Sequence, residues 1–351
     1  MRRRAVTIKD VARSVGVSVS TVSRVLNDTS YVSARTRQVV LQAIRELHFE
    51  PSQIARGFAS KRTATVGLII PDVANPFFSD VARGTEDMAI EEGRATILCN
   101  SDWKSEREVM YLNLLRGRWV DGVIVVGSRC TPQTIAQAAG DVPYVLVERL
   151  QVRTGYTVWI DNRRGGALAT QHLLDIGCRH LVHISGPADS PSAAERRLGF
   201  MDATRRMGLD SYAIIEGDYR FQGGFDIGRQ IFMSDEIPDG VFAANDLMAL
   251  GVLRAAALAG VQVPAQVAVI GYDNIPPTEY ASPALSTVDQ PAYDMGKAAM
   301  KLLLARMQMD ERSGASTGAS LPAPDEAHAT EHQVEFQPRL IVRASTLRSP
   351  T

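Results

Sequence analysis

Cysteine is scarce in this sequence, and the few cysteines present fit neither a disulfide framework nor a zinc site. Cys99, Cys130 and Cys178 are widely spaced in the 351 residues, and each lies in an apolar stretch. This pattern argues against the disulfide scaffold of a secreted domain, and no nucleophile signature surrounds any of the three. We expect buried thiols that remain reduced, as in a cytoplasmic protein.

Long apolar runs are absent as well. No segment approaches the roughly 20 residues that cross a bilayer, and the opening MRRRAVTIKDVARS lacks the apolar stretch of an export signal. The sequence also lacks the G-x-x-x-x-G-K-[ST] loop that binds nucleotide phosphates. These absences favour a cytoplasmic protein that is not an enzyme, with no cofactor, no metal and no membrane partner.

Charge is divided unevenly along the chain. Residues 1–62 hold 12 Lys and Arg against 4 Asp and Glu, whereas the remainder holds 26 against 35. A basic head on an acidic body is typical of a nucleic-acid-binding module joined to a second domain. A basic face that is merely solvated is the alternative, and charge alone does not exclude it.

Three short segments in the first 47 residues repeat apolar residues at helical spacing. The stripes are Ile8, Val11, Ala12 and Val15, then Val22, Val25 and Leu26, then Val39, Val40, Ala43, Ile44 and Leu47. Thr7, Ser18 and Ser33 stand before them as N-caps, and Gly16 ends the first segment. Three short helices with a glycine-containing turn between the first two predict a helix-turn-helix domain over residues 1–48.

The second of these segments, VSVSTVSRVLN, carries small hydroxyl residues and one arginine between its apolar positions. The second helix of a helix-turn-helix domain lies in the major groove, where its outward side chains contact base edges and phosphates. Short hydroxyls and an arginine make such contacts without holding the helix away from the DNA. A three-helix bundle that only caps another domain is the alternative, and the coincident positive charge argues against it.

From Thr65 onward, short apolar strands alternate with longer amphipathic helices. The expected strands are TVGLIIP, ATILCNS, GVIVVGS, YVLVER and TVWIDN, then HLVHISG, AIIEGD, GVFAAND, VAVIGYD and LSTVDQ. The expected helices include 80–92, 105–116, 163–176, 195–207, 246–259 and 291–309. The alternation predicts an α/β body over residues 63–351, with parallel sheets flanked by helices. Two series of strands predict two similar lobes, with a ligand in the cleft at the carboxyl ends of the strands.

Two segments interrupt this pattern. Residues 49–62, FEPSQIARGFASKR, join the head to the body and contain a stretch too short to form a stable helix in isolation. Residues 310–332 are rich in Ser, Ala, Gly and Pro, and we expect a disordered excursion there before a final strand, VEFQPRLIVRAS.

Ordered motifs along nearly the whole chain resemble the LacI/GalR family of bacterial transcriptional regulators. The head contributes TIKDVARSVGVSVSTVSRVLN and VSARTRQVVLQAIRELHFEP, and the join contributes IARGFASKR. The body contributes PDVANPFFSDVARGTE, WVDGVIVV, VWIDNRRGG, HLLDIGCRHLVHISG, ERRLGF, FAANDLMALG, VAVIGYDN and PALSTVDQP. The resemblance implies an all-α helix-turn-helix head, a hinge helix, and a two-lobed effector domain similar to periplasmic sugar-binding proteins. It also implies a homodimer that binds palindromic double-stranded operator DNA.

The resemblance also implies which residues contact DNA. Val19, Ser20 and Arg24 occupy the base-reading positions, and Arg24 is the strongest candidate because arginine binds guanine through two hydrogen bonds. Phosphate contacts and caps are implied for Thr7, Ser18, Thr21, Ser23, Asn27 and Ser33, with capping the favoured role of Ser33. In the hinge, Ile54, Ala55 and Phe58 are implied to enter the minor groove. Phe58 stands where the family usually has leucine, and Gly57 is a second departure that weakens a helix.

An effector pocket is implied at the strand ends of the body. Its residues are Asn75, Phe77, Phe78, Glu148, Arg149, Arg196, Tyr219, Asn245, Asp273 and Gln290. Aromatic rings suit the apolar face of a sugar, and charged and amide groups suit its hydroxyls. The set resembles the pocket of ribose-binding proteins, except that Glu148 stands where aspartate is more usual. Purely structural roles stay open for some members: Phe77 and Phe78 as core, Asn245 and Asp273 as caps.

The expected function is repression of carbohydrate genes, with a pentose or ribose-like sugar releasing the protein from its operator. A purine or nucleoside corepressor within the same family is one alternative, and a sugar-binding protein without a DNA role is another. An enzyme is a third, suggested by DEAH at residues 325–328 and by the spacing of His328 and His332. Both strings lie in the low-complexity excursion, which argues against that alternative.

Overall fold

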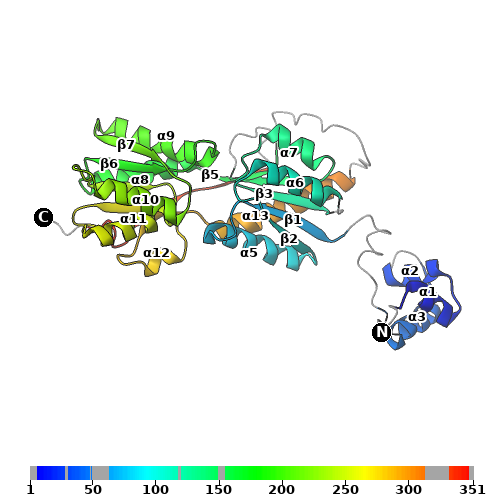
Figure 1. Ribbon diagram of the computed structural model, residues 1–351. Coiled ribbons are helices and arrows are strands. Elements are labelled where there is room, and N and C mark those ends of the chain that lie inside the picture. Colours follow the sequence, from blue (N-terminus) through cyan, green and yellow to red (C-terminus); the bar gives the residue numbers. More distant parts are fainter. Residues whose placement is uncertain are drawn as a thin grey trace. The chain divides into compact units, whose positions relative to one another are not determined.

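The computed structural model describes residues 6–27, 31–47, 49, 63–117, 120–148, 155–312 and 332–347. The chain divides into two compact units, a head of residues Met1–Thr63 and a body of residues Ala64–Thr351 (Figure 1). Of the predicted join over 49–62, only Phe49 is described, and it packs into the core of the head; most of the predicted excursion falls outside the described residues.

The head is a bundle of three helices, α1 (Ile8–Val15), α2 (Val19–Asn27) and α3 (Ala34–Glu46). Its core combines the predicted stripes with one residue that follows α3: Val11, Ala12, Val22, Val25, Val40, Ala43 and Phe49. Gly16 ends α1 with a φ of 68°, which glycine adopts without strain, and so turns the chain toward α2. The helix-turn-helix prediction is confirmed.

The prediction is wrong for one residue of the apolar stripe in α3, which does not lie in the core. Val39 is 46% exposed, whereas Val40 beside it is fully buried. Successive residues of a helix point about 100° apart, and only one face of α3 is covered by the other two helices. An apolar residue next to that face therefore stays in solvent.

The first lobe of the body is a parallel sheet with the strand order β11-β5-β4-β3-β1-β2. Its strands are β1 (Thr65–Ile70), β2 (Ala95–Asn100), β3 (Gly122–Val126), β4 (Tyr144–Val147), β5 (Thr157–Ile160) and β11 (Gln333–Phe336). Its helices are α5 (Pro76–Glu91), α6 (Ser105–Gly117), α7 (Pro132–Ala139) and α13 (Ala292–Arg312). Helices α5 and α13 pack together in one core, and α6 and α7 contribute to a second (Figure 1). Strands β1 and β3 read as nearly continuous apolar runs because both of their faces are covered.

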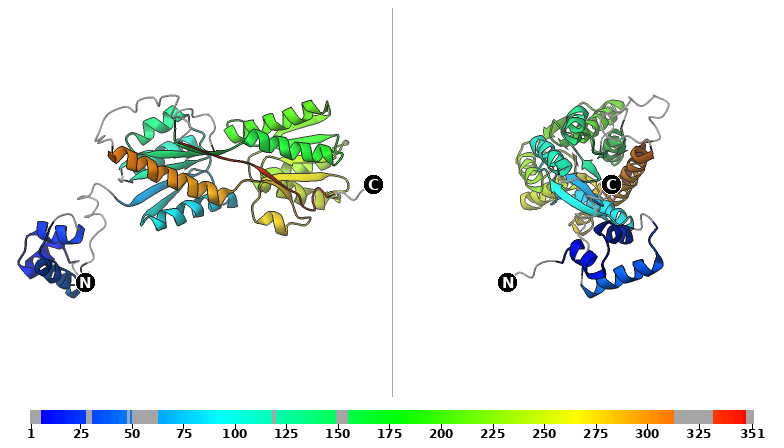
Figure 2. Two further views of the ribbon diagram at one scale, coloured as in Figure 1. Left: turned by 180° about the vertical axis from the view of Figure 1, so that it is seen from behind. Right: turned by 90° about the vertical axis from the view of Figure 1, so that its right-hand side faces the viewer.

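The second lobe repeats this plan with the strand order β12-β10-β9-β8-β6-β7. Its strands are β6 (Leu181–Ser185), β7 (Tyr212–Glu216), β8 (Gly240–Ala243), β9 (Ala268–Asp273), β10 (Ser286–Asp289) and β12 (Arg339–Ile341). Its helices are α8 (Asn162–Asp175), α9 (Pro191–Arg206), α10 (Phe221–Phe232), α11 (Asp246–Ala259) and α12 (Pro277–Tyr280). Helices α8 and α9 share one core, and α10 and α11 share another (Figure 2). The prediction of two similar α/β lobes is confirmed.

Within the described residues, the chain crosses between the lobes three times. It leaves β5 for α8, leaves β10 for α13, and passes from β11 to β12 without an intervening helix. The segment predicted as one final strand is therefore two strands in different sheets, and β12 runs antiparallel to β10. Local sequence could not show this exchange, because a short apolar segment reads the same in either sheet.

Some helix boundaries also differ from those predicted. Helices α5 and α9 begin at Pro76 and Pro191 instead of 80 and 195, since Asn75 and Ser190 cap them and proline is favoured in the first turn. Helix α13 continues to Arg312, so residues 310–312 are helical and do not belong to the excursion. Their charged side chains, unlike the glycines and prolines that follow, are compatible with a helix.

Candidate DNA interface and effector pocket

The outward face of α2 carries the predicted base-reading residues. Val19 is 41% exposed, and Ser20 and Arg24 are exposed on the same helix. Val22 and Val25 point the other way, into the core of the head. The exposure of Val19 fits a role in reading a thymine methyl group, since no packing requirement of the head accounts for a valine there.

The hydroxyl residues of the head act as caps. Ser18 Oγ accepts the backbone N–H of Thr21 at 3.1 Å and lies 2.7 Å from Ser20 Oγ. Thr7 donates its hydroxyl and its backbone N–H to Asp10 at 2.6 and 2.9 Å. Ser33 caps α3 by accepting the backbone N–H of Thr36 at 3.2 Å. Phosphate contacts of these residues and of the half-buried Ser23 stay predictions.

Several predicted site residues lie outside the described part of the chain. They are Ile54, Ala55 and Phe58 of the join, Arg149 after β4, and the side chain of Asn27 at the end of α2. The DEAH string at 325–328 and His328 lie outside it too. His332, the other residue of the suggested metal pair, stacks on Tyr156 with 4.3 Å between ring centroids.

Eight of the ten predicted effector residues line one cavity between the two lobes, whereas Gln290 is not among the lining residues and Arg149 lies outside the described part of the chain. Among the described residues its lining comprises Asn75, Phe77, Phe78, Trp103, Glu148, Ser192, Arg196, Tyr219, Asn245 and Asp273, around a volume of about 20 Å³. The carboxyl ends of parallel strands meet at one edge of a sheet, and this edge of each lobe faces the cavity. A volume of this size holds roughly one water, so a ligand must move side chains or separate the lobes to enter.

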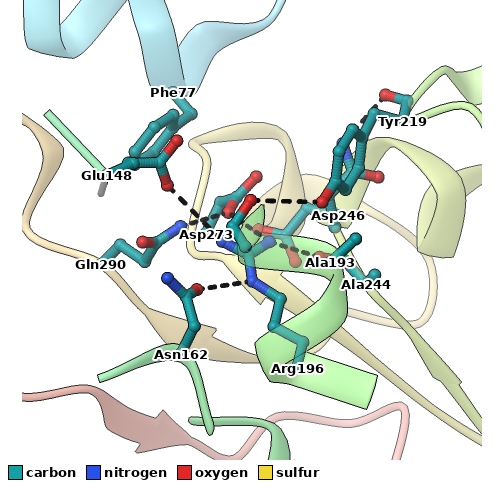
Figure 3. Close-up of polar contacts among 12 residues, drawn as sticks. Phe77, Glu148, Asn162, Ala193, Arg196, Tyr219, Ala244, Asp246, Asp273 and Gln290 are labelled. Carbon is teal, nitrogen blue, oxygen red and sulfur yellow. Dashed lines mark hydrogen bonds and ion pairs between the residues drawn. The ribbon is translucent and has the colours of Figure 1, made fainter. Parts of the chain in front are cut away.

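Arg196 lies at the centre of the polar contacts of the cavity (Figure 3). Its guanidinium donates from Nε to Asn162 Oδ1 at 2.8 Å and from Nη1 to the Ala244 carbonyl at 2.6 Å. The Nη2 and Nη1 atoms lie 3.6 Å from Glu148 Oε1 and 3.7 Å from Asp273 Oδ1. The side chain is only 3% exposed. A buried arginine with two carboxylates and two neutral acceptors is fixed in position before any ligand binds.

The position of α9, which carries Arg196, depends on close contact with α8. A Cβ atom at Gly166 would lie 2.2 Å from the Arg196 carbonyl oxygen, so no larger residue fits there. The Arg196 guanidinium also lies over the ring of Tyr272, 3.8 Å from its centroid. An alanine at Gly166 would push the helices apart and displace the guanidinium from both carboxylates.

The carboxylates around Arg196 are shifted toward their neutral forms. Burial, outweighing the attraction of Arg196, raises the pKa of Asp273 to about 7. Burial likewise raises the pKa of Glu148, with Arg196 opposing the shift. Burial tends to lower the pKa of the Arg196 guanidinium, but the surrounding phenols and carboxylates raise it, so this group stays charged. The cavity therefore holds a permanent cation and, in Asp273, a carboxyl group that can change protonation near neutral pH.

Two neutral side chains support these charged groups. Gln290 Nε2 donates to Asp273 Oδ1 at 2.7 Å, while the buried Gln290 Oε1 has no hydrogen-bond partner among the described residues. Asn245 caps α11 through Oδ1 and donates from Nδ2 to the Tyr219 carbonyl at 2.9 Å. The capping role considered for Asn245 is thus observed, whereas Asp273 pairs with Arg196 and Gln290 instead.

Aromatic rings form the apolar walls. Phe77 and Phe78 belong to the core of the first lobe and also line the cavity, so both roles considered for them are observed. Tyr219 follows β7 and packs against Trp103. Trp103, Ser192 and Asn162 are site residues that sequence reasoning missed. Trp103 follows the end of β2, which is the signal that could have found it.

Other classes of site find no support among the described residues. No cluster of His, Cys, Asp and Glu there could hold a metal ion. No described helix is both long and apolar enough to span a membrane. Cys99, Cys130 and Cys178 are buried, as predicted, and no disulfide joins them to one another.

Comparison with known proteins finds relatives for both units. Residues 7–52 match bacterial regulatory proteins of the lacI family, and residues 170–346 match the periplasmic binding protein-like domain. The ribose operon repressor of Halalkalibacterium halodurans is 37% identical over 302 residues, covering 86% of this chain and 90% of that protein. The lac repressor dimer bound to operator and the anti-inducer ONPF matches with a TM-score of 0.84 and 27% identity, over 98% of this chain and 100% of that one. A LacI family transcriptional regulator from Enterococcus faecium with bound ribose matches with a TM-score of 0.68 and 31% identity, over 80% of this chain and 98% of that one.

Proposed function

The chain belongs to the lacI family of bacterial regulatory proteins, and from this premise we propose that it represses carbohydrate genes until a pentose-like sugar binds its body. Membership makes it a DNA-binding transcriptional regulator that acts as a homodimer on double-stranded operator DNA, and not an enzyme. We place it in the cytoplasm, where bacterial DNA lies.

The observation that carries the choice of a sugar is the set of groups around Arg196. A charged guanidinium and two carboxyl groups offer donors and acceptors on one side of the cavity. Phe78 and Tyr219 offer apolar faces on the others. A sugar ring has hydroxyls around its edge and C–H groups on its faces, which matches both kinds of wall. The Enterococcus faecium regulator with bound ribose supports this choice.

Release from DNA follows from the two-lobed body and the two-fold symmetry. A sugar that favours one arrangement of the lobes shifts the equilibrium by its difference in affinity for the two arrangements. In a dimer this shift changes the spacing of the two heads. Heads that no longer match both half-sites lose the advantage of simultaneous binding, so operator affinity falls. We propose induction by this route.

A binding experiment on the full-length dimer tests the proposal. A palindrome selected from random duplex is titrated at about 0.15 M salt, with pentoses, hexoses, nucleobases and nucleosides added in turn. We expect D-ribose or another pentose to weaken operator binding by roughly 5- to 150-fold. A nucleobase or nucleoside that strengthens binding would replace the sugar with a corepressor. Equal affinity for the palindrome and a scrambled duplex would contradict the DNA-binding assignment itself.

The raised pKa of Asp273 predicts that sugar affinity depends on pH. A sugar hydroxyl that donates to the Asp273 carboxylate favours the charged form, so below a pKa of about 7 the sugar must displace a proton. Affinity should therefore fall on going from pH 8 to pH 6, by at most about tenfold per pH unit. The Asp273→Asn variant should bind more weakly and with less pH dependence, as measured by isothermal titration calorimetry.

The raised pKa of Asp273 also makes the stability of the folded protein depend on pH. The pKa of Asp273 is higher in the folded protein than its usual value of 3.8. Its contribution to the free energy of unfolding is therefore greatest at low pH and is lost as pH rises toward 7. His183 acts in the opposite direction, because burial lowers its pKa from 6.5 to about 4. Comparing Asp273→Asn with the parent in urea unfolding at pH 5 and pH 8 isolates the carboxyl group. An unchanged pH dependence of both affinity and stability would contradict this role.

A further inference from the structure

The turn after β2 has an unusual backbone. Asp102 and Trp103 are consecutive non-glycine residues with φ of 55° and 59°. Side chains rarely adopt this left-handed conformation, and it persists only where surrounding contacts fix it. The contacts around this turn come from both lobes, from Phe78 and Arg129 of the first and from Tyr219 and Arg220 of the second.

Trp103 connects the two lobes through its indole ring. The ring packs against the core of the first lobe and also against a core of the second. It lies 5.5 Å from Phe78 edge-to-face, and it stacks on Tyr219 of the second lobe at 5.3 Å with an angle of 30°. The Arg129 guanidinium lies over it, 5.2 Å from the ring. The indole therefore forms a wall of the effector cavity where the two lobes meet.

Two ion pairs flank this ring, and each joins one lobe to the other. Asp102 pairs with Arg220 at 3.0 Å, and Arg129 pairs with Asp189 at 3.1 Å. The loop that carries Arg129 is held by buried Glu108, which accepts hydrogen bonds from Ser128 Oγ and from the Arg129 backbone N–H. Arg129 Nε is buried without a hydrogen-bond partner among the described residues.

We propose that these residues form an interlobe clasp, and that Trp103 contacts the effector and limits its size. The clasp consists of Asp102, Trp103 and Arg129 of the first lobe with Asp189, Tyr219 and Arg220 of the second. The size limit rests on the proposed sugar effector, whereas lobe closure by the clasp does not. With the rings stacked, only about 20 Å³ remains in the cavity. A pentose needs less space beside the indole than a hexose, whose extra CH2OH group projects from the ring edge.

The size limit is tested with D-ribose and D-allose, since allose in its pyranose form is ribopyranose with one added CH2OH group. Calorimetry on full-length Trp103→Leu should show weaker binding of ribose and stronger binding of allose, with their affinity ratio changed at least about tenfold, because the shorter side chain leaves room for that group. Tyr280→Leu is the matched control, because Tyr280 is an aromatic residue of α12 that is 73% exposed and does not line this cavity. An unchanged ratio in Trp103→Leu, or an equal change in Tyr280→Leu, would overturn the size limit.

Closure is tested without any sugar. Spin labels on α6 and α10 report the distance between lobes in the parent, in Asp102→Asn, in Arg220→Gln and in the double variant. Both pairs are partly exposed, so each single change should raise the open fraction by only about two- to fivefold. The double variant should open no further than either single variant, because both changes break the same pair. Identical distances in all four proteins would overturn the clasp. If no pentose binds the parent, the proposed effector fails, and the distances still decide the clasp.

Discussion

Replacing Arg196 by methionine is expected to abolish the response to the effector while leaving operator binding intact. The guanidinium bonds Asn162 and Ala244 and pairs with Glu148 and Asp273 from a position that solvent does not reach. Without it, a sugar loses its central donor and meets two carboxyl groups with no cation between them. Loss of a charge-assisted hydrogen bond of this kind costs about 1.5–3 kcal/mol, so effector affinity should fall at least about tenfold to a hundredfold.

Stability should fall as well. Removing one member of a buried ion pair destabilises by about 3–5 kcal/mol when the partner stays charged. Here the loss should be smaller, because the raised pKa of Asp273 lets that carboxyl take up a proton. The body should therefore melt earlier, but it should still fold at 25 °C.

The measurement combines calorimetry with the sugar, operator binding with and without it, and thermal unfolding. Arg197→Met is the matched control, since Arg197 neighbours Arg196 on α9 but is exposed. That variant should keep the full response. An Arg196→Met protein that still releases the operator when the sugar is added would show that the effector binds elsewhere.

Replacing Arg24 by alanine is expected to remove most of the ability to discriminate the operator from other DNA. Arg24 is exposed on α2, where a guanidinium can reach the major groove. A bidentate contact to guanine discriminates by about 1–3 kcal/mol, and a symmetric dimer makes it in both half-sites. Specific affinity should then fall by roughly 30-fold to 10⁴-fold, whereas affinity for scrambled duplex should fall much less.

Salt dependence separates base reading from simple charge. Arg45→Ala is the control, because Arg45 is an exposed arginine in the last turn of α3 and its loss changes the charge of the head equally. Both variants should lower non-specific binding by similar amounts over a range of salt concentrations. Only Arg24→Ala should lower the ratio of specific to non-specific affinity. Equal ratios for the two variants would mean that Arg24 contacts phosphate and reads no base.

Much of the site could be predicted from sequence for a simple geometric reason. Polar residues that follow apolar strands, such as Asn245 after β8 and Asp273 at the end of β9, must gather where parallel strands end. The helices of the head could be predicted equally well, because the buried faces of α1 and α2 are set by residues three and four apart in one short segment. The exposed Val39 shows what periodicity cannot predict. The pattern indicates on which face of a helix a side chain lies, but not whether another helix covers that face.

The amino-acid sequence by itself determined the two-part organisation, the basic helix-turn-helix head, the two α/β lobes and most residues of the cavity, because each depends on short-range patterns of polarity and charge. Tertiary structure alone decided the rest. The final segment divides between both sheets, and Trp103 reaches across to Tyr219. The pKa of Asp273 depends on burial between lobes whose contributing residues lie far apart in the chain. Such features arise from contacts between distant segments, and no local pattern encodes which segments will meet.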